Sequence, residues 1–305
     1  MSSIELEAVS RWYGHVVAVN DVSMSIGPGV TGLLGPNGAG KSTLIAMMSG
    51  FLSPSSGTVT LDGQPVWRHE QVYRTVGLVP EREALFDHLT GRGFVRANAQ
   101  LHGLADAGAA ADRAIATVEM ADAQDRQIAT YSKGMRQRIK MASALVHDPA
   151  VLLLDEPFNG MDPRQRMHMM GLLARMGDEG RTVLFSSHIL EEVQQVARQI
   201  EVLVAGRHAA SGDFGEIRRL MTDRPNRYVI RSSDDRRLAA ALIADDSARA
   251  VALRPAGGGI DVEAVDFGRF SWLLPRLSQQ HAITLLEVSA TDESLESVFS
   301  YLISS

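Results

Sequence analysis

The sequence predicts an α/β fold, and three observations support this. Strand-like runs alternate with helix-like stretches over much of the 305-residue chain. The run Val151-Leu-Leu-Leu154 is wholly apolar, as expected for a parallel strand that is buried on both faces. A second strand–helix pattern begins after a polar stretch that contains Pro225. We therefore expect a large α/β domain over residues 1–221 and a small α/β domain over residues 226–305.

The N-terminal third of the chain predicts short strands around one helix. Alternation at period two, or a short apolar run between turn residues, predicts strands at residues 4–9, 22–26, 29–34, 57–61 and 75–79. Residues 42–48 follow a glycine-rich turn and predict a helix.

The middle of the chain changes character. Residues 82–146 are rich in Ala and poor in β-branched residues, which predicts a helical subdomain inserted between core strands. Alternation then returns, with a strand at 151–154, a helix from about Pro163, a strand at 182–185 and a helix at 189–198. In the small domain we expect a strand at 227–230, a turn at 257–259, a helix at 269–280, a strand at 283–288 and a helix at 294–303.

Composition excludes several classes of function. There is no Cys, which excludes disulfides, thiolate metal sites and cysteine nucleophiles. No apolar run reaches eighteen residues and the N-terminus has no signal-peptide pattern, so we expect no membrane-spanning segment. The net charge is −6, without the basic excess of a nucleic-acid-binding protein, so we expect no nucleic-acid partner.

A nine-residue stretch carries the strongest chemical signal. Its residues are Gly35, Pro36, Asn37, Gly38, Ala39, Gly40, Lys41, Ser42 and Thr43, and they fit the pattern G-x-x-x-x-G-K-[ST] between a strand and a helix. The glycines let backbone N–H groups cradle phosphate oxygens, Lys41 reaches the β- and γ-phosphates, and the Ser42 hydroxyl ligates Mg²⁺. A helix N-terminus also favours bound anions. The alternative, a glycine-rich turn without a ligand, does not explain the spacing and the flanks together.

Lysine is rare in this chain. Only Lys41, Lys133 and Lys140 occur among thirty basic residues. This rarity indicates that position 41 requires the compact point charge of an ammonium group, which the planar guanidinium of Arg does not replace. An Arg-rich composition with three remaining lysines is the alternative, but it does not explain a lysine in the phosphate loop.

Two carboxylates follow the buried strand 151–154. Groups that act on a ligand gather at the carboxyl ends of parallel strands. Asp155 is placed to hold Mg²⁺, and Glu156 to orient or deprotonate a water molecule that attacks the γ-phosphate. A strand that simply ends in solvated acids is the alternative, and the phosphate loop makes it weaker.

Further motifs accompany these two. They are Tyr13 in Arg-Trp-Tyr-Gly14, Val79-Pro-Glu81, Tyr131-Ser-Lys-Gly-Met135 ahead of Arg136-Gln-Arg138, Asn159-Gly-Met-Asp162 and Ser186-Ser-His188. Their order resembles that of the ATP-binding subunits of ATP-binding cassette (ABC) transporters, over roughly residues 3–215. The resemblance implies a P-loop ATPase core with a β-subdomain and an inserted helical subdomain, together with the cofactors ATP and Mg²⁺.

The resemblance also implies roles for single residues. It makes residues 35–43 the Walker A motif and residues 152–157 the Walker B motif. It places Ser132, Gly134 and Asp162 against ATP that is bound by a second copy of the chain. His188 contacts the γ-phosphate and Glu81 the metal or the attacking water. Tyr13 stacks on adenine, although Trp12 is a neighbouring candidate and either ring could instead be core.

Two motifs depart from the commonest family pattern. Tyr131, Lys133 and Met135 differ from the usual signature, and Glu81 stands where Gln is usual. Both departures resemble the ATPases of two-component exporters of the ABC-2 type. Residues 286–299 also resemble the C-terminal extension of that subgroup, although an unrelated packing domain stays possible.

Three functions stay in view. The resemblance implies an ATPase that dimerises head to tail around two Mg-ATP and drives a separate membrane-spanning permease, as an exporter. Such a subunit would be cytoplasmic and would lie on the inner face of the membrane through the permease. The alternative is a soluble ABC-type ATPase that acts on nucleic acid or the ribosome, which the acidic balance disfavours. A binding module without turnover is the third, and Asp155, Glu156 and His188 speak against it.

Overall fold

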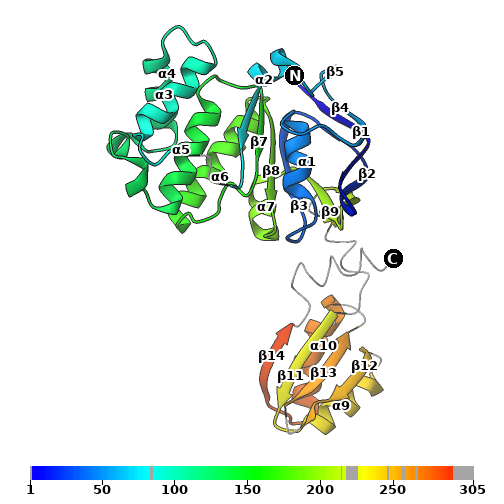
Figure 1. Ribbon diagram of the computed structural model, residues 1–305. Helices are drawn as coiled ribbons and strands as arrows, with labels where there is room; N and C mark the ends of the chain where they lie inside the picture. Colours follow the sequence, from blue (N-terminus) through cyan, green and yellow to red (C-terminus); the bar gives the residue numbers. More distant parts are fainter. Residues whose placement is uncertain are drawn as a thin grey trace. The chain divides into compact units, whose positions relative to one another are not determined.

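The computed structural model describes residues 2–82, 85–213, 215–217, 226–245, 247–255, 258–264 and 267–290. The chain forms two compact units, Met1–Phe214 and Gly215–Ser305 (Figure 1). Both combine helices and strands, so the predicted α/β class is confirmed. The expected helix at 294–303 and most of the expected polar boundary near 222–226 lie outside the described residues.

A six-stranded sheet organises the first unit. Its strand order is β10(Arg207–Gly212), β9(Gln199–Val204), β3(Gly29–Leu34), β8(Thr182–Ser187), β7(Val151–Leu154) and β6(Val76–Val79). The five strands from β9 to β6 are parallel, and only β10 is antiparallel to its neighbour. The carboxyl ends of the five parallel strands therefore meet at one edge. Burial on both faces explains why β7 and β8 read as apolar runs.

A second, antiparallel sheet packs against the first through one helix. Its strands are β2(Val16–Ile26), β1(Ile4–Tyr13), β4(Ser56–Leu61) and β5(Gln64–Pro65). Helix α1(Lys41–Met48) shares one apolar cluster with both sheets, through Leu44, Ile45 and Met48. Helices α6(Pro163–Asp178) and α7(Leu190–Val196) pack on β3 and β8. Helix α1 is thus held between the two sheets, and this fixes the loop that precedes it.

A helical block lies between β6 and β7 in the sequence, as predicted. It contains α3(Gly91–Leu101), α4(Ala107–Thr117) and α5(Lys133–Leu145), with two short 3₁₀ turns, η1(Ala121–Ala123) and η2(Ile128–Thr130). The side chains of Thr90, Asp106 and Ser132 cap the three helices. The three helices pack on one another, and α5 also contacts β6. Helix α5 therefore joins this block to the sheet.

The second unit repeats a strand–helix–strand pattern. Its order is β11(Asn226–Ser232), α9(Asp235–Ala244), β12(Ala248–Leu253), β13(Ile260–Ala264), α10(Phe267–Gln280) and β14(Leu285–Ala290). The sheet order β12-β13-β11-β14, with antiparallel neighbours, is the split βαβ arrangement. One core joins strands and helices, and in it the rings of Tyr228 and Phe270 stack with centroids 4.9 Å apart.

Several elements differ from the predictions. Strands β9 and β10 were not predicted. Strand β10 contains only polar and small residues, whereas β9 is largely apolar and its pattern was missed. Helix α2(Glu70–Thr75) precedes β6 and was also not predicted. In the small unit α9, β12 and β13 were not predicted. Among the described residues no helix combines the length and the apolar character needed to cross a bilayer.

Candidate functional site

Four parallel strands deliver the predicted groups to one edge of the large sheet. Strand β3 leads into the loop 35–40, and β6 leads into Pro80 and Glu81. Strand β7 leads into Asp155 and Glu156, and β8 leads into His188. Because neighbouring parallel strands end at the same edge, residues that are far apart in sequence form one cluster there.

The phosphate loop folds tightly around the ammonium group of Lys41. Lys41 Nζ donates to the carbonyl oxygens of Gly35 and Pro36, at 2.8 and 3.1 Å. Gly40 has φ 101°, and a Cβ atom there would lie 2.4 Å from the carbonyl oxygen of Ala18. Only glycine fits such a position. The loop also presents Asn37, Gly38 and Ser42 to solvent, where a ligand could reach them.

One buried hydroxyl aligns the two carboxylates. Ser186 Oγ donates to Asp155 Oδ1 at 2.6 Å and accepts from the Glu156 backbone N–H at 2.8 Å. Sequence analysis assigned Ser186 no role. The fold brings Ser186 to the carboxylates, because Phe185 pairs with Leu154 and the residues that follow are Ser186 and Asp155.

Glu156 lies between a lysine and a histidine. Its Oε1 atom lies 3.7 Å from Lys41 Nζ, and its two carboxylate oxygens lie 3.0 and 3.1 Å from His188 Nδ1. Its φ of 48° lies in the left-handed region, which costs a non-glycine residue about 1–3 kcal/mol. Two hydrogen bonds hold the Glu156 backbone in this conformation. Its N–H donates to Ser186 Oγ, and its carbonyl oxygen accepts from Gln137 Nε2 at 3.3 Å.

Burial sets the protonation of this cluster. Burial raises the pKa of Glu156 above its ordinary value, against the opposing effects of His188 and Lys41. Burial also lowers the pKa of Lys41, and the charges of Glu156, Asp155 and Glu81 oppose that shift. Glu81 is exposed and follows β6, which ends at the same edge of the sheet as β3.

A second cluster forms at the N-terminus of α5. Ser132 is the N-cap of the helix and accepts from the Met135 N–H at 3.2 Å. A Cβ atom at Gly134 would lie 2.7 Å from Oε1 of the Gln165 side chain and 3.0 Å from the carbonyl oxygen of Gly160, so any larger residue would crowd this contact. Tyr131 is buried, and its hydroxyl donates to the Ala123 carbonyl oxygen at 2.7 Å. Tyr131, which differs from the usual residue of the signature motif, is therefore a core residue of the helical block.

The remaining predicted residues are exposed. Asp162 caps α6, because its carboxylate accepts from the Gln165 N–H at 2.9 Å. Tyr13 is 48% exposed at the end of β1, and the guanidinium carbon of Arg11 lies 4.9 Å from the centroid of its ring. Trp12 is 45% exposed, so neither candidate ring belongs to the core. Of the predicted residues, the structure thus brings residues 35–43, Glu81, Asp155, Glu156 and His188 to one edge of the sheet. Gly134 lies against Gly160, in the segment that ends at Asp162.

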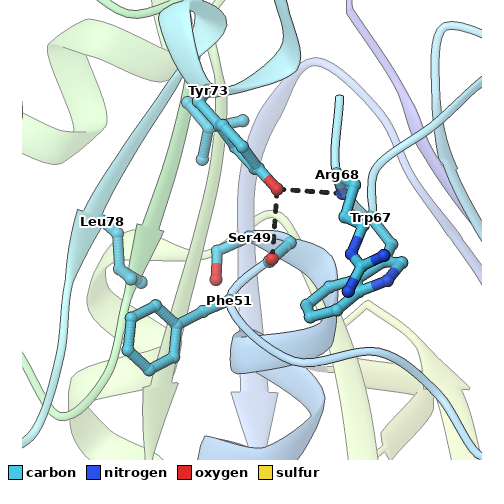
Figure 2. A pocket seen from close by; sticks show the side chains of 8 residues that line it. Ser49, Phe51, Trp67, Arg68, Tyr73 and Leu78 are labelled. Atoms are coloured by element: carbon cyan, nitrogen blue, oxygen red, sulfur yellow. Dashed lines mark hydrogen bonds between the residues drawn. The ribbon is translucent and has the colours of Figure 1, made fainter. Parts of the chain in front are cut away.

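A cavity of about 450 Å³ lies beyond the C-terminal end of α1. It is lined by Ser49, Gly50, Phe51, Trp67, Arg68, Tyr73, Val76 and Leu78 (Figure 2). The Tyr73 hydroxyl accepts from the Arg68 N–H at 3.0 Å and donates to the Gly50 carbonyl oxygen at 3.4 Å. Phe51 is 81% exposed, so the cavity has an apolar rim.

The groups at the sheet edge suit Mg²⁺. The Ser42 hydroxyl and the carboxylates of Asp155 and Glu81 are hard oxygen donors, which this ion prefers. No group of three or more His, Cys, Asp or Glu among the described residues could hold a metal by itself.

Comparison with known proteins gives consistent matches. The profile of the ABC transporter family matches residues 19–159. An uncharacterised ABC transporter ATP-binding protein of Nostoc is 39% identical over 66% of this chain and 62% of its own length. The linearmycin resistance ATP-binding protein LnrL of Bacillus subtilis is 30% identical over 97% of this chain and 96% of its own. The bacitracin transport ATP-binding protein BcrA of Enterococcus faecalis is 30% identical over 98% of this chain and 96% of its own length.

Solved structures agree with this assignment. The structure of an ATP-binding subunit of an ABC transporter covers 72% of this chain and 92% of its own, with a TM-score of 0.65 and 27% identity. A dimeric structure of a bacterial ABC transporter cassette, at 22% identity, shares the fold with a TM-score of 0.65. Because two relatives align over nearly the whole chain at 30% identity, the chain belongs to the ATP-binding proteins of ABC transporters, a family of ATPases.

Proposed function

We propose that the chain hydrolyses ATP as one of two identical subunits that close around two Mg-ATP, and that this cycle drives a separate membrane-spanning permease at the cytoplasmic face. One observation carries the proposal: Lys41, Glu156 and His188 follow three different strands, β3, β7 and β8, and meet at one edge of the sheet. Positioning and charge neutralisation are most of what phosphoryl transfer needs.

The residues of the cluster divide the work. The N–H groups of the loop 35–40 and Lys41 bind the phosphate oxygens and stabilise the charge that develops on them. Glu156 orients a water molecule and accepts its proton as the water oxygen bonds to the γ-phosphorus and the bond to ADP breaks. A raised pKa makes Glu156 a better base than an ordinary carboxylate. His188 holds the Glu156 carboxylate through Nδ1 and contacts the γ-phosphate through its other nitrogen.

Mg²⁺ would be held by Ser42 and Asp155, with Glu81 nearby, and would neutralise charge on the β- and γ-phosphate oxygens. Asp155 is prepared for this by the hydroxyl of Ser186, which fixes one of its oxygens. Tyr13 offers an exposed ring for adenine.

The second copy supplies the other half of each site. Ser132 and Lys133, at the start of α5, are exposed, and a helix N-terminus favours an anion. We expect this cluster to meet the γ-phosphate that is bound to the partner's phosphate loop.

The permease would contact the cavity beyond α1. Leu78 lines the cavity from β6, and the same strand continues into Pro80 and Glu81. A partner seated against Phe51 and Leu78 would therefore touch the segment that carries Glu81. The names of LnrL and BcrA, which concern antibiotic resistance and transport, favour export as the direction.

The first test compares the wild-type chain with Glu156→Gln after purification in mild detergent from the cells that produce it. We expect the variant to bind ATP and to hydrolyse it about 10²–10⁴-fold more slowly, because the proton acceptor is lost. Near-normal turnover would remove Glu156 from its role.

The same purification tests the partner. We expect a polytopic membrane protein in stoichiometric amount, lost in Phe51→Ser and retained in Met167→Ser, which changes another exposed apolar residue outside the cavity. A soluble ATP-dependent dimer without a membrane protein would favour a soluble factor instead.

A further inference from the structure

Lys140 makes contacts that the reaction described above does not use. It lies on α5, two turns after the N-cap Ser132, and it is only 5% exposed. Its ammonium nitrogen donates to three consecutive carbonyl oxygens, those of Pro80 at 2.7 Å, Glu81 at 3.3 Å and Arg82 at 3.5 Å. A buried ammonium group is costly unless it is hydrogen-bonded, and here main-chain oxygens of the Glu81 segment provide those bonds.

The residue type matters. The chain uses Arg at nearly every basic position, and Lys140 is one of three lysines. An ammonium group is a compact charge whose donors can follow oxygens that converge from several directions, whereas a guanidinium presents a flat fork. Arg138, two residues earlier on the same helix, is also buried and also donates to carbonyls, those of Val118 and Glu119. Arg138 therefore ties α5 to the helical block, and Lys140 ties it to the segment after β6.

Helix α5 thus holds main-chain oxygens on two sides of the ATP site. Gln137, one turn before Lys140, donates to the carbonyl oxygen of Glu156 after β7. Lys140 holds the carbonyls after β6. The N-terminal end of the same helix carries Ser132.

We propose that Lys140 is a positioning residue for hydrolysis: it fastens residues 80–82 to α5, so that the Glu81 carboxylate and the Ser132 end of the helix move as one body. This rests on the proposed function, because it gives Glu81 a place at the metal. The contacts go to main-chain oxygens, so their effect is on where the segment lies relative to the phosphate loop.

Hydrogen–deuterium exchange of the full chain without nucleotide tests the fastening directly. We expect Lys140→Met to speed exchange of the amides of Glu81 and Arg82 by at least about tenfold, as expected when a local anchor is lost. Arg138→Met is the matched control and should leave these two amides unchanged. Lys140→Arg should restore the slow exchange only in part. Unchanged exchange at Glu81 and Arg82 in Lys140→Met would overturn the proposal.

Hydrolysis as a function of Mg-ATP concentration tests the consequence. We expect Lys140→Met to change the apparent affinity for Mg-ATP together with kcat, whereas Arg138→Met changes neither. Because Lys140 acts through the Glu81 segment, adding Lys140→Met to Glu81→Ala should alter the kinetics by less than about twofold. Full additivity of the two changes would overturn the positioning role.

The outcomes separate this inference from the proposed function. If Glu81→Ala leaves Mg-ATP dependence unchanged while Lys140→Met still speeds exchange, the fastening stands and the role of Glu81 at the metal is wrong. If Lys140→Met changes neither exchange nor kinetics while Glu156→Gln abolishes turnover, the ATPase stands and the inference fails. Should Lys140→Met prove unstable in thermal unfolding, Lys140→Arg carries the exchange measurement.

Discussion

At the scale of single residues, Glu156 is the most constrained group of the site, in its backbone, its burial and its charged neighbours. Its backbone is left-handed, its side chain is buried, and it lies between Lys41 and His188. Such strain persists only where the surroundings hold it, and here Ser186 and Gln137 hold the peptide groups on either side. Strain, burial and a perturbed pKa at one carboxylate together are typical of a group that acts on a substrate.

The pKa of Glu156 leads to a pH prediction. Only the ionised carboxylate accepts a proton, so hydrolysis should rise with pH through the pKa of Glu156, which burial places above that of an ordinary glutamate. His188 lowers this pKa, so His188→Ala should raise it further and move the acidic limb of the rate profile to higher pH. The measurement is the pH at the midpoint of the acidic limb, at saturating Mg-ATP, in the wild-type chain and in His188→Ala. The absolute rate is not the readout.

A second histidine provides the control for the pH profile. His208 Nε2 lies 2.6 Å from the buried carboxylate of Glu201, in the β9–β10 hairpin outside the cluster. His208→Ala should leave the acidic limb where it is. An unmoved limb in His188→Ala would show that His188 does not set the protonation of Glu156.

At the scale of elements, the loop that carries His188 is tied to α6. Glu192 of α7 is buried, accepts from Ser187 Oγ at 2.7 Å and pairs with Arg166 Nη1 at 3.2 Å. Ser187 Oγ in turn accepts from the Ile189 N–H at 3.0 Å. Since α6 starts at the cap Asp162, this chain of contacts joins the Asp162 end of α6 to the residues on both sides of His188.

This tie gives a stability prediction. Arg166→Met removes the ion-pair partner of a buried carboxylate, so we expect the free energy of unfolding to fall by about 1–3 kcal/mol. Arg198→Met is the matched control, because its pair with Asp178 is exposed and should contribute less than about 1 kcal/mol. Thermal or urea unfolding of the three proteins measures both effects. Equal losses in the two variants would show that Glu192 does not depend on Arg166.

The elements also show what a sequence can reveal. The apolar run 151–154 predicted β7 to the residue, because a strand buried on both faces has an unambiguous pattern. The hairpin strand β10 was missed, because an edge strand of small and polar residues carries no period. The phosphate loop, Asp155, Glu156 and His188 followed from motifs. Ser186, Gln137 and Lys140 did not, because their partners lie on other elements and only the fold brings them together.

At the scale of the whole molecule, the proposed function gives one chain two half-sites. The phosphate loop with Glu156 forms the first, and Ser132 at the exposed start of α5 belongs to the second. If a second copy completes each site, ATP binding and dimer closure must depend on the two halves differently. Binding of ATP needs only the first half, and dimer closure needs both.

This division gives a prediction about assembly. In the Glu156→Gln background we expect ATP to produce a dimer in size-exclusion chromatography with light scattering. Adding Ser132→Arg should abolish the dimer, because a bulky cation at the helix start blocks the approach of the partner, while ATP binding by the monomer persists.

Ser56→Arg, a change at another exposed serine, at the start of β4 and outside both half-sites, is the control and should leave the dimer intact. A dimer that survives Ser132→Arg would place the interface elsewhere on the molecule.

The order of strands in the large sheet has a consequence for how the chain is made. Strand β3 lies at the centre of the sheet, yet its partners β8 and β9 come much later in the chain, and Gly29 pairs with Thr182. During synthesis the phosphate loop therefore leaves the ribosome long before the strands that support it, and the apolar centre of the sheet waits for residue 204 or so to appear. A nascent chain halted before β9 should thus leave one edge of β3 unpaired and open to chaperones.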